Sequence, residues 1–137
     1  MSKLPITGGC LCGALRYEAS APPGFAGYCC CVDCRKASGS GFIPFMGFPA
    51  AVMRFSGEAR QVRSRAYRGT EAVRNVCPSC GGLVFGGEVG IDTSHTLYAG
   101  SLDDPSWFQP SMVLFERDRP AWVALPEGLQ VFETMPE

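Results

Sequence analysis

Short runs of alternating polar and apolar residues, separated by glycine and proline, recur along the whole chain. Residues 60–68 (RQVRSRAYR) alternate with a period near two, which is typical of a half-buried strand. Segments rich in β-branched and aromatic residues predict further strands at residues 14–19, 42–48, 51–55, 72–76, 83–86, 95–100, 111–116 and 129–133. Short helical turns are expected only around residues 34–38 and 103–108. The pattern therefore predicts one mainly β domain over residues 1–137, with no internal linker.

Composition and charge narrow the class of protein. The chain is 46% hydrophobic and 18% charged, as globular domains are, and its formal net charge is −1. No strong field therefore draws it to nucleic acid or to an anionic membrane, and the arginines of residues 54–74 are expected on solvated strand faces. The longest uncharged run, residues 37–53, contains prolines and glycines and predicts buried strands rather than a membrane span. We expect a cytosolic location, because residues 1–9 lack the apolar segment of a secretory signal.

Cysteine is the residue type that points to chemistry. The eight cysteines fall into three tight groups, which are Cys10 and Cys12, then Cys29, Cys30, Cys31 and Cys34, and finally Cys77 and Cys80. Close grouping is typical of metal ligands, and a reducing compartment disfavours a disulfide framework. Disulfides and buried free thiols are the alternatives.

The first and last groups together predict a structural zinc site. Cys77 and Cys80 are separated by two residues and followed by Gly81 and Gly82, which is the spacing of a zinc knuckle. A knuckle supplies two of the four ligands that such a site needs. Cys10 and Cys12 can supply the others, since residues i and i+2 of an extended segment point to the same face.

The middle group predicts a second, open zinc site. By the same alternation, Cys29 and Cys31 face one side and Cys30 the other, while Cys34 follows Cys31 at the knuckle spacing. Three protein ligands without a fourth leave a position for water or substrate. Two alternatives stay open at this point. Cys30 could close a purely structural Cys₄ site, or the three cysteines could bind metal weakly or not at all.

The ordered set of motifs resembles the glutathione-dependent formaldehyde-activating enzyme family, which also includes centromere protein V. The matching motifs cover nearly the whole chain and are Gly8–Glu18, Cys29–Gly39, Cys77–Gly81, Gly100–Pro105 and Pro120–Trp122. The resemblance implies the mainly β, Mss4-like fold of that family. This chain departs from the family at two positions: Cys30 stands where the family usually has histidine, and Val76 where it usually has phenylalanine.

The resemblance also implies roles for individual residues. Cys10, Cys12, Cys77 and Cys80 match the structural zinc ligands, and Cys29, Cys31 and Cys34 match the ligands of the catalytic zinc. The implied reaction joins glutathione, as co-substrate, to formaldehyde, and in reverse it is a carbon–sulfur lyase reaction. Arg35, Lys36 and Ser38 follow the ligands directly and are candidates to bind the anionic tripeptide; the alternative is that they form the capped, solvated start of a helix.

Three functions are compatible with these residues: a lyase acting on a glutathione–aldehyde adduct, a non-catalytic carrier of glutathione or its adducts or an interaction module, and a redox or metal sensor using Cys30. No general base stands out. His95 is expected to be a surface or strand histidine, and Asp103 to cap the turn at Pro105 rather than to act with Asp104. The expected partner is a small thiol or aldehyde, with no nucleic acid and no membrane. The sequence does not indicate an oligomeric state.

Overall fold

The structure is a computed structural model that describes residues 3–136, which form two β-sheets and a single α-helix. The smaller sheet is antiparallel and has the order β1-β2-β5. Its strands are β1 (Ile6–Gly9), β2 (Arg16–Ala19) and β5 (Met53–Ser56). The mainly β fold predicted from the sequence is confirmed.

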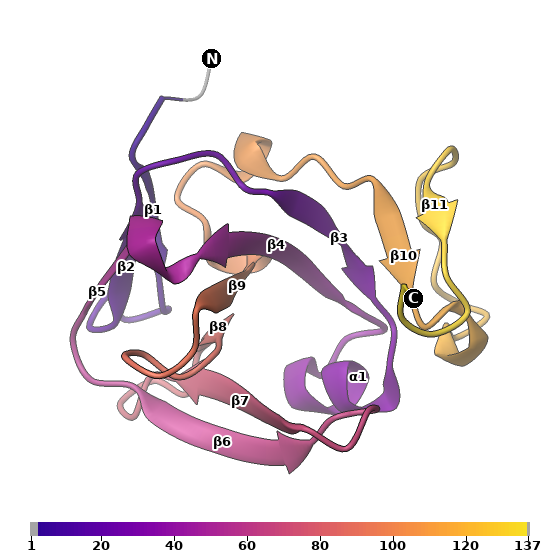
Figure 1. The fold of residues 1–137 in the computed structure, drawn as a ribbon, viewed down its shortest axis with the longest axis horizontal. Coiled ribbons are helices and arrows are strands. Elements are labelled where there is room, and N and C mark those ends of the chain that lie inside the picture. The colour runs from indigo at the N-terminus through magenta and orange to yellow at the C-terminus, as the bar shows by residue number, and fades with distance from the viewer. Residues whose placement is uncertain (1–2, 137) are drawn as a thin grey trace.

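The larger sheet has eight strands in the order β11-β10-β3-β4-β9-β8-β7-β6, antiparallel except where β10 pairs with β3 and β11. Its strands are β3 (Phe25–Cys29), β4 (Ile43–Pro49), β6 (Arg60–Arg65), β7 (Glu71–Val76), β8 (Leu83–Gly86), β9 (Ser94–Tyr98), β10 (Met112–Leu114) and β11 (Gln130–Val131). Figure 1 shows that this sheet curls, so that α1 lies between the β6–β7 hairpin and the ends of β3 and β4.

The single α-helix, α1 (Val32–Ser38), is short and capped at both ends. Cys31 is its N-cap, and the Sγ atom of Cys31 accepts a hydrogen bond from the Cys34 N–H. The helix ends at Gly39, whose φ of 72° lies in the left-handed region that favours glycine. The remaining helical turns are of the 3₁₀ type and are Ala50–Val52, Ala99–Ser101, Pro105–Trp107 and Glu116–Asp118.

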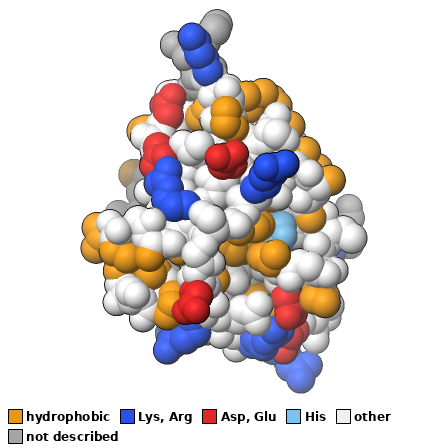
Figure 2. Space-filling view, turned by 90° about the vertical axis from the view of Figure 1, so that its left-hand side faces the viewer, with side chains coloured by type: hydrophobic (Ala, Val, Ile, Leu, Met, Phe, Trp, Pro, Cys, Tyr) orange, Lys and Arg blue, Asp and Glu red, His pale blue; other side chains and the backbone are white. Residues whose placement is uncertain are grey.

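Alternation along the strands gives the larger sheet two different faces. Met46 pairs with Leu97, and Phe48 with His95, on the face that packs against the smaller sheet. This interface contains the main core, in which Tyr17, Phe85 and Leu97 are among the fully buried side chains. Figure 2 views the molecule from the side of the smaller sheet, where basic and acidic side chains lie beside one another rather than in a patch of one sign.

The opposite face of the larger sheet carries a smaller apolar cluster. Phe45, Leu114 and Phe115 form its buried part, and Cys29, Cys31, Met112, Phe132 and Met135 pack against them. Cys29 of β3 pairs with Ile43 of β4, two residues before Phe45, so Cys29 lies on the same face as Phe45. The middle cysteine group is therefore on this second face.

Candidate metal centres and the clefts beside them

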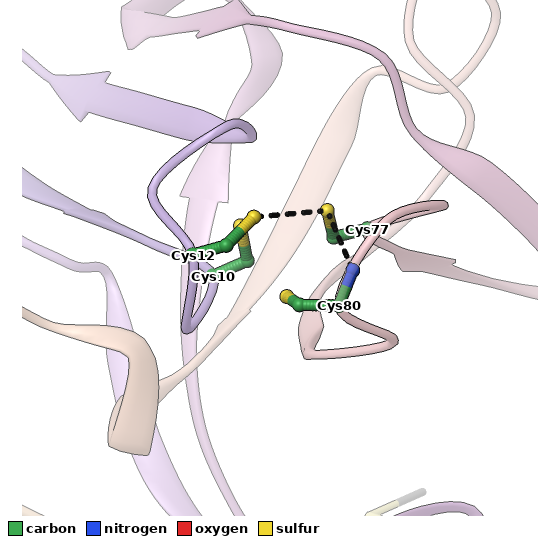
Figure 3. A group of neighbouring side chains, drawn as sticks. All are labelled: Cys10, Cys12, Cys77 and Cys80. Carbon is green, nitrogen blue, oxygen red and sulfur yellow. Dashed lines mark hydrogen bonds between the residues drawn. The ribbon is translucent and has the colours of Figure 1, made fainter.

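The first group of thiols joins two turns that are distant in sequence. Cys10 and Cys12 lie in the turn between β1 and β2, and Cys77 and Cys80 in the turn between β7 and β8. Figure 3 shows the two pairs facing one another. The Sγ atoms all lie within 4.8 Å of one another, and both Cys10–Cys12 and Cys12–Cys77 are 3.7 Å apart.

These distances match a tetrahedral zinc site. Four sulfurs at a Zn–S distance of about 2.3 Å lie about 3.8 Å from one another at the corners of a tetrahedron. Backbone N–H groups also point at the sulfurs: Leu15 donates to Cys10 at 3.3 Å, and Gly82 to Cys80 at 3.4 Å. Burial raises the pKa of Cys10, but the hydrogen bonds with Leu15, Cys77 and Cys12 together lower it by more, so that the resulting pKa is about 6. The four residues therefore fit a closed zinc site.

The conformation of the Cys10–Cys12 pair differs from the extended segment that we expected. The chain turns at this point, with the Gly13 N–H donating to the Cys10 carbonyl and the Cys10 N–H donating to the Leu15 carbonyl. Gly13 has a φ of 82°, which such a turn requires of a residue without Cβ. Leu11 stands at the tip of the turn, 90% exposed. The turn, rather than strand alternation, brings the two sulfurs together.

The second group lies where β3 leads into α1. Cys29 is the last residue of β3, Cys31 caps α1, and Cys34 is in the first turn of the helix. Their Sγ atoms lie within 4.8 Å of one another, and all three residues are half-buried. The helix cap places the Cys34 N–H 3.2 Å from the Cys31 sulfur. Three soft sulfur donors around one point fit a zinc ion with an exchangeable fourth position.

Cys30 is not part of this group. It has no exposed surface, and its N–H donates to the Leu114 carbonyl at 3.0 Å. Burial, and then the carboxylate of Glu116, raise the pKa of the Cys30 thiol to about 11. Cys30 is therefore a neutral thiol packed on the side of Glu116 and Arg119.

The thiols of the second group shift one another's pKa values. Hydrogen bonds with the thiols of Cys29 and Cys34 lower the pKa of Cys31 well below its usual range, whereas hydrogen bonds with Cys31 and Cys34 raise that of Cys29. The nearby guanidinium of Arg74 contributes to lowering the pKa of Cys31, and its Nη2 atom lies 3.8 Å from the Cys34 sulfur. A lowered pKa favours the thiolate form of Cys31, which is the form that binds a metal ion.

A cleft of about 680 Å³ opens beside Cys29 and Cys31. Four arginines line it, and they are Arg65, Arg68, Arg74 and Arg117. Among residues 3–136, only Arg117 of the four has an acidic partner within 4.0 Å, namely Asp118 at 3.6 Å. Arg117 also lies over the ring of Tyr67, 5.3 Å from its centroid. The cleft is therefore cationic and adjoins the second group of thiols.

Sequence reasoning missed these arginines: it assigned Arg65, Arg68 and Arg74 to solvated strand faces and did not single out Arg117. Alternation could place Arg65 and Arg74 on a strand face, but only the curl of the larger sheet brings the β6–β7 hairpin beside Cys29. Sequence reasoning also missed Tyr98, which lines a second cleft together with Cys29, Cys34 and Arg74. Burial raises the pKa of Tyr98, so that its hydroxyl stays protonated.

The three residues proposed to bind glutathione lie on α1 away from the arginine-lined cleft, whose lining does not include them. Ser38 donates to the Cys34 carbonyl at 2.8 Å. A further cleft, near Cys10 and Gly81, is lined by Ser38 but not by Arg35 or Lys36. A role of Arg35, Lys36 and Ser38 in binding the tripeptide stays a prediction.

The acidic pair after β9 has a structural function, but not in the residue that we expected. Asp104, not Asp103, caps the turn at Pro105, and its Oδ1 accepts from the Ser106 N–H at 3.0 Å. Asp104 directly precedes the proline, which is the N-cap position when proline takes the first place of a helical turn. Asp103 instead binds Arg16, with Nη1–Oδ1 at 3.0 Å, and Thr7.

His95 is a strand residue on the core side of the larger sheet and is 4% exposed. Its Nδ1 atom lies 3.1 Å from the Gly86 carbonyl oxygen, and its ring packs against Phe55 and Phe85. Within residues 3–136, no helix has the length and apolar character needed to span a membrane.

Comparison with known proteins gives a family match. A family model described as "Glutathione-dependent formaldehyde-activating enzyme" matches residues 5–118. A crystal structure of a Rhodobacter sphaeroides protein resembles the chain with a TM-score of 0.53 and 21% sequence identity, covering 71% of this chain and 87% of that chain. At this identity the likeness concerns the fold alone. No curated protein matches the chain significantly.

Proposed function

The chain belongs to the glutathione-dependent formaldehyde-activating enzyme family, and on this premise we propose that it is a zinc-dependent carbon–sulfur lyase acting on a glutathione–aldehyde adduct. S-hydroxymethylglutathione, formed from glutathione and formaldehyde, is the simplest such adduct. The proposed zinc ions are one structural ion at Cys10, Cys12, Cys77 and Cys80, and one catalytic ion at Cys29, Cys31 and Cys34.

One observation supports the proposal above all: two of the three clustered, half-buried thiols, Cys29 and Cys31, line a cleft that four arginines also line. Glutathione carries two carboxylates, and arginine is the side chain best suited to bind a carboxylate through two parallel hydrogen bonds. Asp33 also lines the cleft and is available to the ammonium group of the tripeptide. A tripeptide bound there would present its sulfur to the Cys29, Cys31 and Cys34 group.

The chemistry needs a thiolate and a stabilised oxygen. Zinc bound by three thiolates would supply a soft Lewis acid that favours sulfur and lowers the pKa of a bound thiol. In the synthetic direction the glutathione sulfur forms a bond to the aldehyde carbon, and the carbonyl oxygen becomes a hydroxyl. In the lyase direction that bond breaks, the carbonyl forms, and the hydroxyl proton passes to the departing glutathione sulfur.

The residues of the chain contribute orientation and hydrogen bonds. Arg74 lines both clefts beside the thiols, where its charge stabilises a developing alkoxide or thiolate. Tyr98, neutral because of its raised pKa, can donate a hydrogen bond to the same oxygen. No carboxylate or histidine base is needed, because the thiolate is itself the nucleophile.

The test is the rate at which formaldehyde exchanges between its free hydrate and the glutathione adduct, measured by magnetisation-transfer NMR with ¹³C-formaldehyde. We expect the zinc-loaded protein to raise this rate in proportion to its concentration, and Cys31→Ser to remove the increase. Trp122→Ser, which changes an exposed aromatic residue that lines neither cleft, is the matched control and should retain the full rate.

An exchange rate equal to that of the protein-free solution would contradict the lyase. If glutathione still bound under those conditions, the non-catalytic carrier would replace it as the proposed function.

A further inference from the structure

A second cleft, of about 450 Å³, adjoins the same thiols and differs in chemistry from the first. The two clefts share Cys29, Arg74, Ala72 and Met135. The lining of the second cleft is mainly apolar, and its larger apolar side chains are Phe25, Ile43, Phe45, Val73, Leu114 and Met135. We call it the apolar cleft.

The pairing of β3 with β4 builds the floor of the apolar cleft. Phe25 pairs with Gly47, and Gly27 pairs with Phe45, so each phenylalanine lies opposite a glycine on the neighbouring strand. A Cβ atom at Gly47 would lie 2.1 Å from the Phe25 ring, which shows that the ring occupies the space over the glycine. Phe25 also meets Phe45 edge-on, with ring centroids 6.0 Å apart. The sequence thus provides an aromatic floor at the mouth of the thiol site.

This floor is partly open to solvent. Phe25 is 52% exposed, although residues of its type usually bury most of their surface. An apolar cavity with a few polar groups at one end is the usual form of a small-molecule site. Here Cys29, Cys34, Arg74 and Tyr98 form the polar end beside the thiol group, and the cleft is also lined by Glu71, Asp92, Ser94 and Thr96.

Formaldehyde does not use such a space. The group that it adds to glutathione is one carbon and one hydroxyl. One water molecule occupies about 30 Å³ in the liquid, so a group of two heavy atoms fills only a small part of a cleft of about 450 Å³. The arginine-lined cleft already offers a place for the charged tripeptide, so the apolar cleft would stay empty in an adduct of formaldehyde.

We propose that the adduct carries an apolar substituent on its sulfur-bound carbon, and that this substituent occupies the apolar cleft. The substrate class is then the hemithioacetal of glutathione with a larger, apolar aldehyde. This inference rests on the proposed function. Cleavage of such an adduct breaks the carbon–sulfur bond and converts the C–OH group to the aldehyde, and the hydroxyl proton is returned to the glutathione sulfur.

Binding of stable thioethers tests the inference without turnover. Isothermal titration calorimetry of the zinc-loaded protein would compare glutathione, S-methylglutathione and S-hexylglutathione. We expect S-hexylglutathione to bind at least about tenfold more tightly than S-methylglutathione, because its chain buries additional apolar surface. Phe25→Ser should reduce that ratio at least about threefold. Trp122→Ser, which removes an exposed aromatic residue outside both clefts, should leave the ratio unchanged.

The outcomes separate the two proposals. Equal affinities for the two thioethers would overturn the inference and leave the proposed function standing. A preference for S-hexylglutathione that survives Phe25→Ser would also overturn it, because the chain would then bind elsewhere. Failure of glutathione and both thioethers to bind at millimolar concentration would overturn the proposed function, and the inference with it.

Discussion

At the scale of single residues, Cys30 shows how adjacent cysteines take different environments. Its side chain is fully buried, and its pKa is raised to about 11, first by burial. A neutral, inaccessible thiol is a poor nucleophile and a poor target for oxidants, which disfavours a redox sensor based on Cys30. We predict that Cys30→Ala keeps the full zinc content and loses only about 1 kcal/mol of stability through the small cavity left behind. Zinc per chain measures this, and loss of one ion would make Cys30 a ligand.

Tyr98 gives a second prediction at this scale. Its hydroxyl lies against Gly86, where an added Cβ would be 2.9 Å from the oxygen, and the ring lines the apolar cleft with Cys34 and Arg74. Tyr98→Phe should lower kcat for adduct exchange about tenfold, equivalent to about 1.4 kcal/mol, and leave KM nearly unchanged. A fall in thermal stability with kcat intact would show that the hydroxyl is only structural.

At this scale the sequence predicted some residues of the candidate site and missed others. The two groups of thiols could be predicted, because metal ligands are close in sequence and their spacing follows from turn geometry; that they bind zinc stays a prediction. Arg65 and Arg74 gave no such signal, since their position beside the thiols depends on residues more than 30 positions away. Cys10 and Cys12 were grouped correctly although their backbone forms a turn rather than a strand.

At the scale of elements, the alternating segments of the sequence correspond to strands of the structure. The strands β1 and β3 were not predicted, because glycines break their patterns: Gly8 and Gly9 in the first, Gly27 in the second. Gly8 is required by packing, since an added Cβ would lie 2.2 Å from the Tyr17 hydroxyl. The strand β1 was therefore missed because strand propensity carries no information about the close packing of Gly8 against Tyr17 in the folded state.

The element-scale prediction concerns α1, whose N-cap Cys31 is also a proposed zinc ligand. Serine is among the best N-cap residues, so Cys31→Ser retains an acceptor for the Cys34 N–H while it removes a thiolate. We expect α1 and the melting temperature to be nearly unchanged and one zinc to be lost per chain. Circular dichroism and metal analysis measure the two effects. Unfolding of this variant would show that the second site also stabilises the fold.

At the scale of the whole molecule, the first group of thiols connects the two sheets. Cys10 and Cys12 follow β1 of the smaller sheet, and Cys77 and Cys80 follow β7 of the larger. A structural zinc contributes about 10 kcal/mol or more to folding, which is comparable to the total stability of a small domain. Cys77→Ser should therefore leave the protein unfolded or molten at 25 °C. A Cys77→Ser protein as stable as Cys31→Ser would contradict this difference between the two sites.

The last prediction uses both sites at once, with cobalt in place of zinc as a spectroscopic probe. Four thiolates saturate the first site, whereas the second has three and adjoins the arginine-lined cleft. A soft exogenous thiol should therefore enter the coordination of the second ion only. Titration with glutathione should change the thiolate-to-metal absorption of one cobalt of two, and Cys31→Ser should abolish the change. S-methylglutathione, which has no ionisable thiol, is the matched control and should leave the spectrum as it was. An unchanged spectrum at millimolar glutathione would remove the chemical basis of the lyase, because the sulfur that must react would not reach the metal.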